Sequence, residues 1–594
     1  MAIVSNPFVD YLSRYTTASP DHEAAFDEFL AQAPSPAGGP LRLTTRVEEF
    51  LRISFAQPSP PSVILTGNAG DGKTYLCRQI ITTFAGQSVV DWQAFADQPI
   101  ERDGKRLHVI KDLSELGRAQ GLMILRGLAD TFAGGSADRY LIAANEGRLR
   151  ALLGDDPELR VLYDAIDGQL RHGAENGSPS LMVINLTAVT TSSFVPGALK
   201  WMTMAKHWDA CQVCPILQRC PIRHNAHQLA EEHIAGRVQM LYQLLEHLDI
   251  HVTVRDMLIH LAFTLTGGQR CADLQRLDQA HRDLSGFAYY ENIWGGANSA
   301  FRRKASVVQH LDRLHIGDHS LFDIDDFIVS SGETPQRQTE HAQLFAPAVD
   351  INHRRFGQDR QAYVEGGADR QADGEADTLM RWLPHCRRKL FFEWRELDRV
   401  NRLIPFLYLD DYWELLRDEQ GVRDQLRRDL VLGLNRAFSR LYLTDSNNLY
   451  VTTQYIHSTE QPRPLVRLTI PTQGIEIRVD RRPNLTYDCD RPDLHLVIAA
   501  PPALTMHSGA VPKPQSWRMN LLLFEYLMRL ANGGTYNILA EECELSVRDL
   551  KDRLLSAFAH EPASGAIEFF VAERQRYTLR KLKIDERGTI RSEG

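Results

Sequence analysis

The sequence of 594 residues has no apolar run near the ~20 residues that a membrane-spanning helix requires. Residues 1–7 also lack the basic stretch and following apolar segment of a secretory signal. Both absences argue against an integral membrane protein and against a secreted one. We therefore expect a cytoplasmic protein that does not insert into a membrane.

Positive charge is not in excess, and cysteine is scarce. The formal net charge is -9 and the sequence pI is about 6.2, which leaves room for a local basic channel that contacts DNA. The eight cysteines are too few for a disulfide scaffold. Because three of them crowd into residues 211–220, we expect a reduced protein with one metal site.

The sequence also lacks a repeat of solenoid period, and its length favours several domains. Its hydrophobic pattern predicts a helical leader at 1–60, an α/β domain at 61–194, a helical lid with a cysteine-rich insertion at 195–330, a linker or mobile insertion at 331–378, a helical region at 379–448 and a C-terminal α+β region at 449–594, winged-helix-like at 514–585.

Residues 61–194 alternate β-branched runs with amphipathic helices, which is typical of a parallel sheet flanked by helices. The expected strands are 62–66, 88–92, 107–110, 139–143 and 181–186. In the lid, helical periodicity is clearest over 231–246 and 254–265. The C-terminal region is expected to contain strands at 449–456, 465–470, 475–479, 494–499, 567–572 and 576–582, and helices at 518–532 and 547–558.

A glycine-rich motif joins the first expected strand to the helix after it. It reads Gly67-Asn68-Ala69-Gly70-Asp71-Gly72-Lys73-Thr74 and matches the P-loop pattern Gly-x4-Gly-Lys-Thr. The strand before it and the helical run from Tyr75 supply the context that this motif requires. A chance glycine-rich turn is the alternative, and the complete motif in the right context disfavours it.

The motif predicts that residues 67–75 bind ATP and Mg²⁺. Its three glycines allow the backbone N–H groups to approach phosphates at a helix N-terminus. Lys73 supplies a positive charge to the β- and γ-phosphates, and the Thr74 hydroxyl ligates Mg²⁺. The α/β region is therefore expected to be a P-loop NTPase domain.

Hydrolysis also needs an acidic residue that holds the water shell of the metal. Asp112 follows the expected strand 107–110 and is the best candidate. Leu113 stands where a second acidic residue usually follows, so Glu115 or Glu146 would have to act as the base. The alternative is that Asp112 only caps the next helix.

Two polar residues resemble the sensor positions of AAA+ ATPases. Asn145 follows the expected strand 139–143, where AAA+ proteins keep a residue that bonds the γ-phosphate or the attacking water. Residues 252–258 resemble the sensor-2 segment of an AAA+ lid, in which Arg255 would reach the phosphates. Arg255 as a solvated charge on a helix face is the alternative.

The clustered cysteines form a Cys-x2-Cys-x5-Cys-x3-His pattern made of Cys211, Cys214, Cys220 and His224. The pattern predicts a tetrahedral zinc site, with His227 as another possible fourth ligand. An iron–sulfur cluster is one alternative and would need a fourth cysteine such as Cys271, and free structural thiols are another. In each case we expect the site to staple an insertion rather than to perform chemistry.

The order of these elements resembles one ATPase family. The elements are the P-loop, the strand end at 145–147, the cysteine-rich insertion, the lid segment 253–255 and the runs 287–294, 387–392 and 432–438. Together they resemble AAA+/STAND P-loop ATPases, and among these the DptF-type ATPase of phosphorothioation-dependent DNA restriction. The resemblance implies an ATPase subunit of a multi-protein anti-phage complex acting on DNA that lacks a protective backbone modification.

Two other function classes remain open. A STAND-type signalling switch would use ATP to drive assembly, and Leu113 favours that class. A helicase-like or nuclease-loading motor is the other. Whichever class holds, the chain could also form a homo-oligomer. In the winged-helix-like segment, Arg548, Lys551 and Arg553 would face DNA phosphates, unless Asp549 and Asp552 make this a balanced, solvated helix face.

Overall fold

The computed structural model describes residues 4–13, 15, 36–85, 99–102, 104–172, 180–280, 284–346, 354–365, 375–417, 420–453, 465–481, 491–501, 512–534, 540–558, 566–573, 576–584 and 589–593. The chain divides into two compact units. Unit 1 consists of Met1–Glu246, Ile250–Pro405 and Pro483–Asp490, and unit 2 of His247–Asp249, Phe406–Arg482 and Arg491–Gly594. No helix of the described residues is both long enough and apolar enough to cross a membrane.

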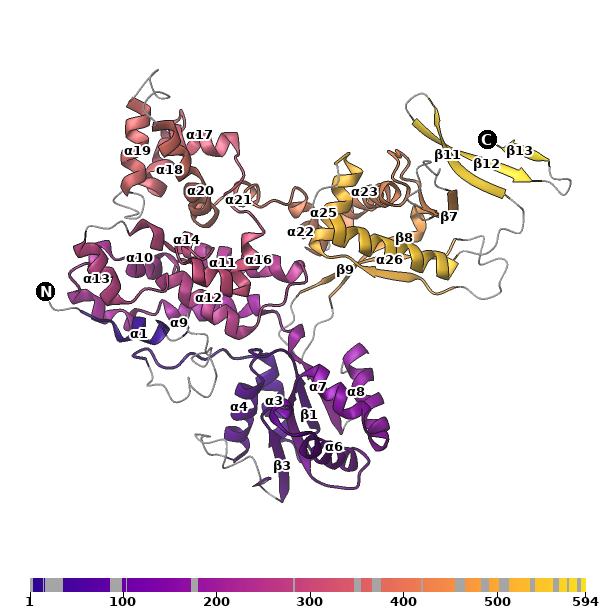
Figure 1. The fold of residues 1–594 in the computed structure, drawn as a ribbon, viewed down its shortest axis with the longest axis horizontal. Helices are drawn as coiled ribbons and strands as arrows, with labels where there is room; N and C mark the ends of the chain where they lie inside the picture. Colours follow the sequence, from indigo (N-terminus) through magenta and orange to yellow (C-terminus); the bar gives the residue numbers. More distant parts are fainter. Residues whose placement is uncertain are drawn as a thin grey trace. The chain divides into compact units, whose positions relative to one another are not determined.

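Unit 1 contains a five-stranded sheet in the order β2-β3-β4-β1-β5 (Figure 1). The strands are β1 (Ser62–Thr66), β2 (Ile100–Arg102), β3 (Lys105–Ile110), β4 (Arg139–Ala144) and β5 (Leu181–Asn185). Strands β3, β4, β1 and β5 run parallel, and β2 pairs antiparallel with β3. The predicted α/β sheet is confirmed, the expected strand 88–92 lies outside the described residues, and β2 was not expected.

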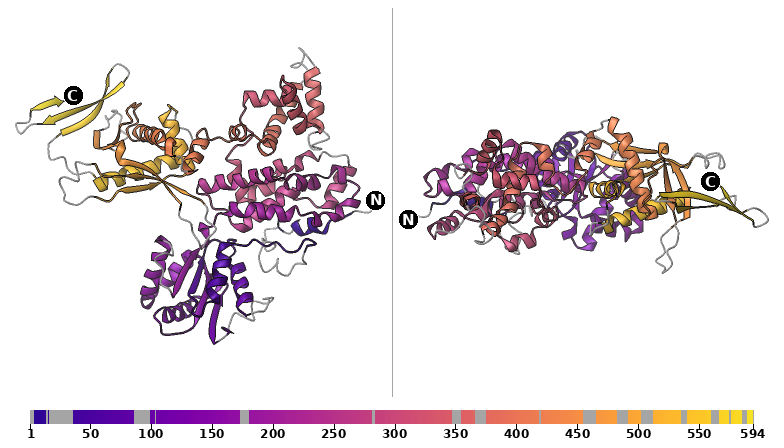
Figure 2. Two further views of the ribbon diagram at one scale, coloured as in Figure 1. Left: turned by 180° about the vertical axis from the view of Figure 1, so that it is seen from behind. Right: turned by 90° about the horizontal axis from the view of Figure 1, so that it is seen from above.

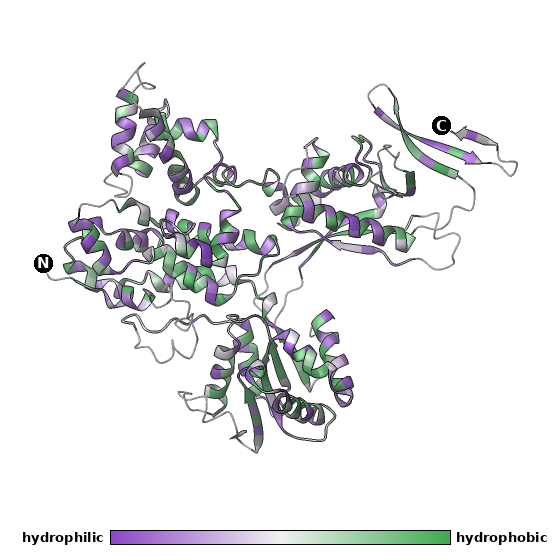
Figure 3. Cartoon of the chain, viewed as in Figure 1, coloured by the Kyte–Doolittle hydropathy of each residue, from purple (hydrophilic) through white to green (hydrophobic). Residues whose placement is uncertain are grey.

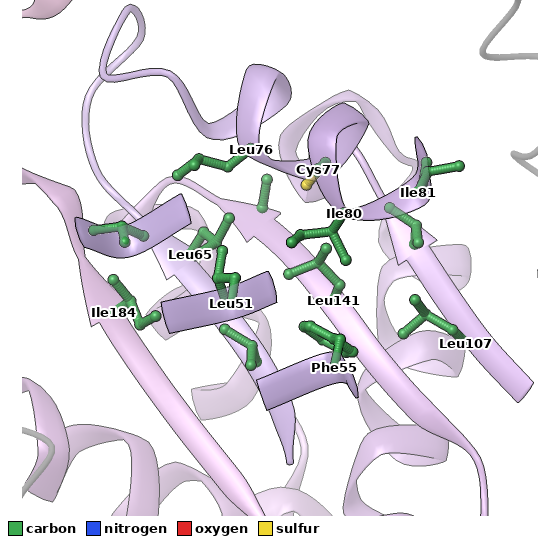
Figure 4. Packing of buried hydrophobic residues seen from close by; sticks show 14 of the residues in the cluster. Leu51, Phe55, Leu65, Leu76, Cys77, Ile80, Ile81, Leu107, Leu141 and Ile184 are labelled. Atoms are coloured by element: carbon green, nitrogen blue, oxygen red, sulfur yellow. The ribbon is translucent and has the colours of Figure 1, made fainter. Parts of the chain in front are cut away.

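Helices cover both faces of this sheet. They are α3 (Arg46–Ala56), α4 (Lys73–Ala85), α6 (Arg118–Phe132), α7 (Glu146–Gly154) and α8 (Arg160–His172). Figure 4 shows Leu51 of α3 and Ile80 of α4 packed against Leu65 and Leu141 of the sheet. On the other face, Ile64 packs with residues of α6, α7 and α8. Every residue of β1 is buried, as expected for a parallel strand covered on both faces.

The rest of unit 1 is helical (Figures 1 and 2). Its helices are α1 (Pro7–Ser13), α9 (Val195–Met202), α10 (Pro221–Gln228), α11 (Glu232–His247, whose last residue belongs to unit 2), α12 (Val254–Thr266), α13 (Cys271–Gln279), α14 (Tyr289–Asn292), α15 (Ser299–Lys304), α16 (Ser306–Asp312), α17 (Phe322–Ser330), α18 (Pro335–Phe345), α19 (Arg354–Glu365), α20 (Glu375–Glu393) and α21 (Leu397–Asn401). The two lid helices predicted most clearly are α11 and α12.

The stretch 331–378 differs from the expected linker. Its described parts contain α18, α19 and the start of α20. Phe345 of α18 and Phe356 of α19 are buried, and the centroids of their rings lie 5.4 Å apart. His341 Nε2 also bonds the carbonyl oxygen of Ile328 on α17 at 2.9 Å. A few buried aromatic residues therefore anchor helices whose remaining surface is polar. The Gly- and Asp-rich run 366–374 lies outside the described residues.

Unit 2 contains two antiparallel sheets, in the orders β10-β9-β8 and β13-β12-β11-β7-β6. Its elements are α22 (Leu409–Arg417), α23 (Gln420–Ser439), β6 (Asn448–Thr452), β7 (Leu465–Pro471), β8 (Ile475–Asp480), β9 (Asp493–Ile498), β10 (Gln515–Arg518), α25 (Leu521–Ala531), α26 (Ala540–Phe558), β11 (Ala566–Glu573), β12 (Arg576–Ile584) and β13 (Ile590–Glu593). Figure 3 shows α25 as largely hydrophobic, and it packs against α23.

The guanidinium group of Arg436 on α23 stabilises the end of α25. It is buried and donates to the carbonyl oxygens of Leu530 and Ala531, each at 2.8 Å, and to that of Leu443 at 2.9 Å. The last carbonyls of a helix have no partner within the helix, so this arginine supplies the missing donors.

Of the two interpretations of α26, the sequence favours a balanced, solvated face over a DNA-contacting one, and the structure shows that Lys551 belongs to neither. Lys551 is buried, and its ammonium group donates to the carbonyl oxygen of Thr453 at 2.9 Å and to Thr452 Oγ1 at 3.3 Å. Arg553 pairs with Asp549 at 2.7 Å, as the solvated-face alternative expected. Lys551 therefore links α26 to β6 and to Thr453, the residue after it. Its long side chain places the ammonium group inside the protein, where oxygen atoms of Thr452 and Thr453 accept hydrogen bonds from it.

Candidate nucleotide-binding site

The glycine-rich loop connects β1, which lies between β4 and β5, to α4. Its three glycines have φ angles of 148° at Gly67, 102° at Gly70 and 87° at Gly72. Residues with a Cβ adopt such angles only with strain, so the backbone path depends on glycine at these positions. The loop predicted from the sequence thus has the strand–loop–helix setting that its motif requires.

Lys73 is the first residue of α4, and its side chain turns back into the loop. Its Nζ donates to the carbonyl oxygens of Gly67 and Asn68, both at 2.8 Å. Burial lowers the pKa of Lys73, while the carboxylates of Asp71 and Asp112 act to raise it. A positive charge is therefore concentrated at the positive end of a helix dipole, and a polyanion placed there would interact with both.

Asp71 ties the loop to the helical part of unit 1. Its Oδ2 accepts from the backbone N–H of Asn68 at 2.6 Å, and its Oδ1 accepts from His251 Nε2 at 2.8 Å. Only 9% of the surface of Asp71 is exposed. The sequence motif leaves this position unspecified, and His251 lies 180 residues further along the chain, so no local pattern predicts this pair.

The start of α12 packs directly on the loop. The backbone N–H of Arg255 donates to the carbonyl oxygen of Gly70 at 3.2 Å. Thr253 caps α12, and its Oγ1 would lie 2.8 Å from a Cβ added at Gly70. Arg255 is partly buried, and desolvation lowers its pKa. The structure thus brings the sensor-2-like segment to the loop, and Arg255 is not a fully solvated charge on a helix face.

Asp112 lies two residues beyond β3. Its Oδ1 accepts from the backbone N–H of Ser114 at 2.7 Å and so caps the 3-10 helix Leu113–Glu115. Strands β3 and β1 both run parallel to β4, so Asp112 and the glycine-rich loop follow strands that end at the same edge of the sheet. The capping role is therefore present, and it does not exclude a role for Asp112 at that edge.

The other expected catalytic side chains have partners of their own. Asn145 Oδ1 accepts from the backbone N–H groups of Gly147 and Arg148 and caps α7. Glu146 Oε1 lies 2.9 Å from Arg150 Nε. Glu115 is 61% exposed at its side chain and lies 3.5 Å from Lys111. Strand β4 lies between β3 and β1. Asn145 follows β4, whereas Asp112 follows β3 and the glycine-rich loop follows β1.

Thr74 and Tyr75 occupy the first turn of α4. Tyr75 packs against the apolar cluster formed by α3, α4 and one face of the sheet, and its hydroxyl lies 3.4 Å from Glu48 Oε2 of α3. Its side chain therefore points toward α3 and not into the loop. Thr74 is partly buried beside Lys73 at the helix N-terminus, where its backbone N–H adds to the anion-attracting end of α4.

Four cysteines line one small cavity in unit 1, which we call the four-cysteine site; they are Cys211, Cys214, Cys220 and Cys271. His224 and His227, expected as ligands, are not among the residues that line it. Within the described part of the chain, no three His, Cys, Asp or Glu side chains are grouped to hold a single metal ion. Burial raises the pKa of Cys220 to about 12 and that of Cys271 to about 11.

Comparisons of this chain with protein-family models, with curated proteins and with solved structures find no match.

Proposed function

We propose that the chain is an ATPase that binds ATP with Mg²⁺ in the loop 67–74. The conformation of the loop supports this proposal: three glycines with positive φ shape it, and the Lys73 ammonium group bonds the carbonyl oxygens of Gly67 and Asn68 at the N-terminus of α4. Backbone N–H groups, the helix dipole and a lysine at one point suit the β- and γ-phosphates of a nucleotide. In this proposal Thr74 ligates Mg²⁺, and Asp112 holds the metal through water.

The proposal predicts that Lys73→Ala abolishes ATP binding or turnover. This substitution removes the positive charge that the loop places on the phosphates. Lys200→Ala is the matched control, because Lys200 is an exposed lysine in the last turn of α9. Nucleotide affinity and steady-state ATP hydrolysis are measured on both full-length variants, with circular dichroism to compare their folds. A folded Lys73→Ala protein with unchanged ATP turnover would contradict the proposed ATP site.

We further propose that this ATPase belongs to a DNA-restriction complex that defends against phage. The support is the resemblance of the sequence elements to the DptF-type family, and DNA would be engaged directly or through partner subunits. Co-expression with the products of neighbouring genes tests this role. We expect a complex that restricts unmodified DNA and loses restriction with Lys73→Ala, and a chain that associates with no neighbouring product contradicts it.

A STAND-type switch is the second candidate, and Leu113 favours it. Leu113 is completely buried at the position where a second acidic residue would serve hydrolysis. In that case ATP binding alone would drive assembly. The mass of the assembly formed in solution, measured with ATP and with a non-hydrolysable analogue, separates the two functions. A switch should form the same larger assembly with both nucleotides. An ATPase that turns over continuously should hydrolyse ATP without forming such an assembly.

A further inference from the structure

The four-cysteine site is assembled from segments that are distant in the sequence. Cys211 lies in the 3-10 helix Asp209–Val213, and Cys214 follows it directly. Cys220 is the N-cap of α10, and Cys271 is the first residue of α13, 51 positions later in the chain. All four line the same cavity, together with apolar side chains such as Val9, Trp208 and Leu274.

Backbone and side-chain N–H groups point at the sulfur atoms. The buried Asn6 donates from its backbone N–H to Cys271 Sγ at 3.4 Å and from Nδ2 to Cys211 Sγ at 3.2 Å. Two helices, α10 and α13, begin at the site, so their positive ends face the sulfurs. N–H groups directed at ligand sulfur atoms are a regular feature of iron–sulfur sites.

The lining of the cavity favours four sulfur ligands over the Cys3His set expected for zinc. It includes Cys271 and neither His224 nor His227. A zinc ion would need all its ligands at about 2.0–2.3 Å from one point. An iron–sulfur cluster is wider, because inorganic sulfide bridges its iron atoms and each cysteine binds a different part of it. Four cysteines around an apolar cavity, with N–H groups directed at sulfur, meet that requirement.

We propose that the four-cysteine site holds an iron–sulfur cluster with Cys271 as its fourth ligand. The cluster would join α10, α13 and the segment around Asn6, which the sequence separates widely. Gln275 of α13 already pairs with the backbone of Val4, donating to its carbonyl oxygen at 2.6 Å and accepting from its N–H at 3.2 Å. The N-terminal segment is thus part of the binding site, and the proposal is independent of ATP hydrolysis.

The test is metal and sulfide analysis of the full chain purified without oxygen. We expect iron and acid-labile sulfide in equal amounts, two or about four of each per chain, with a visible charge-transfer absorption. Cys271→Ser should lose iron as completely as Cys211→Ser. His224→Ala and Cys386→Ala should keep it, since neither residue lines the site. Lys73→Ala should also keep it, which separates this proposal from the ATPase proposal.

Three outcomes would overturn the inference. They are one equivalent of zinc without sulfide, no bound metal in the wild-type chain even after anaerobic reconstitution with iron and sulfide, and full iron content in a Cys271→Ser protein. The metal and sulfide content of the wild-type chain tests the proposal even if a cysteine variant fails to fold, because that measurement needs no substitution.

Discussion

At the scale of single residues, Asp112 has a capping role that the structure shows and a metal-binding role that we propose. Its carboxylate caps the 3-10 helix Leu113–Glu115 and also acts on the charge of Lys73. A cap needs only an oxygen acceptor, whereas a metal-bound water shell needs negative charge. Substitution by asparagine therefore separates the roles, because asparagine keeps the acceptor and removes the charge.

We predict that Asp112→Asn keeps the fold and some nucleotide affinity but loses Mg²⁺-dependent turnover by ~100-fold or more, as expected for a group that positions the metal. Asp156→Asn is the matched control, because Asp156 caps the 3-10 helix Pro157–Leu159 in the same way at 3.1 Å. Steady-state ATP hydrolysis across a Mg²⁺ titration is the measurement. Normal turnover in Asp112→Asn would leave Asp112 with the capping role alone.

At the residue scale, the sequence predicts local geometry where a motif has a specific spacing and misses contacts that are long-range. The glycine-rich loop was expected between a strand and a helix, and it lies there. Its binding of nucleotide stays a prediction. The Asp71–His251 pair was not identifiable, since neither a fixed spacing nor a local pattern links the two residues. Cys271 was identifiable only as one candidate among isolated cysteines, and only the tertiary structure brings it to the cavity that Cys220 lines.

At the scale of elements, hydrophobic pattern predicted the buried strands and missed the polar elements. Strands β1, β4 and β5 are apolar runs with little ambiguity. Strand β2 has the sequence Ile-Glu-Arg and is an edge strand. It therefore lacks the run of apolar residues by which a buried strand is recognised in a sequence. Helix α19 is predominantly polar, and its sequence resembles a linker because Phe356 alone is buried completely within it.

The contact between α12 and the loop gives an element-scale prediction. Gly70→Ala should weaken ATP binding ~10-fold or more, because φ is 102° there and the new Cβ would lie 2.8 Å from Thr253 Oγ1. Gly168→Ala in α8 is the control, since a Cβ there meets nothing within 4 Å. Nucleotide titration of both variants is the measurement, and wild-type affinity in Gly70→Ala would show that the loop does not need this packing.

At the scale of the whole molecule, each unit has its own apolar core, and the proposed nucleotide site lies entirely in unit 1. In the proposal, the glycine-rich loop and Lys73 would bind the phosphates, but no acidic side chain is free to activate water in the arrangement that the structure describes. Leu113 is buried where a carboxylate would serve, and the acidic candidates Glu115 and Glu146 pair with Lys111 and Arg150. Binding without rapid hydrolysis is the resulting expectation for the isolated chain.

We therefore predict that ATP turnover is triggered by a macromolecule, most directly by double-stranded DNA presented with a partner subunit. Closure would have to release Glu115 or Glu146 from its lysine or arginine and bring an arginine to the γ-phosphate. Loss of such transition-state charge costs ~10³-fold or more in rate, so the resting chain should hydrolyse ATP slowly. Steady-state hydrolysis is measured with and without DNA and the products of neighbouring genes. Glu115→Gln and Glu146→Gln then identify the base, because only one of them should abolish the stimulated rate while leaving ATP affinity unchanged. A fast basal rate that no addition alters would contradict triggering and leave an autonomous ATPase.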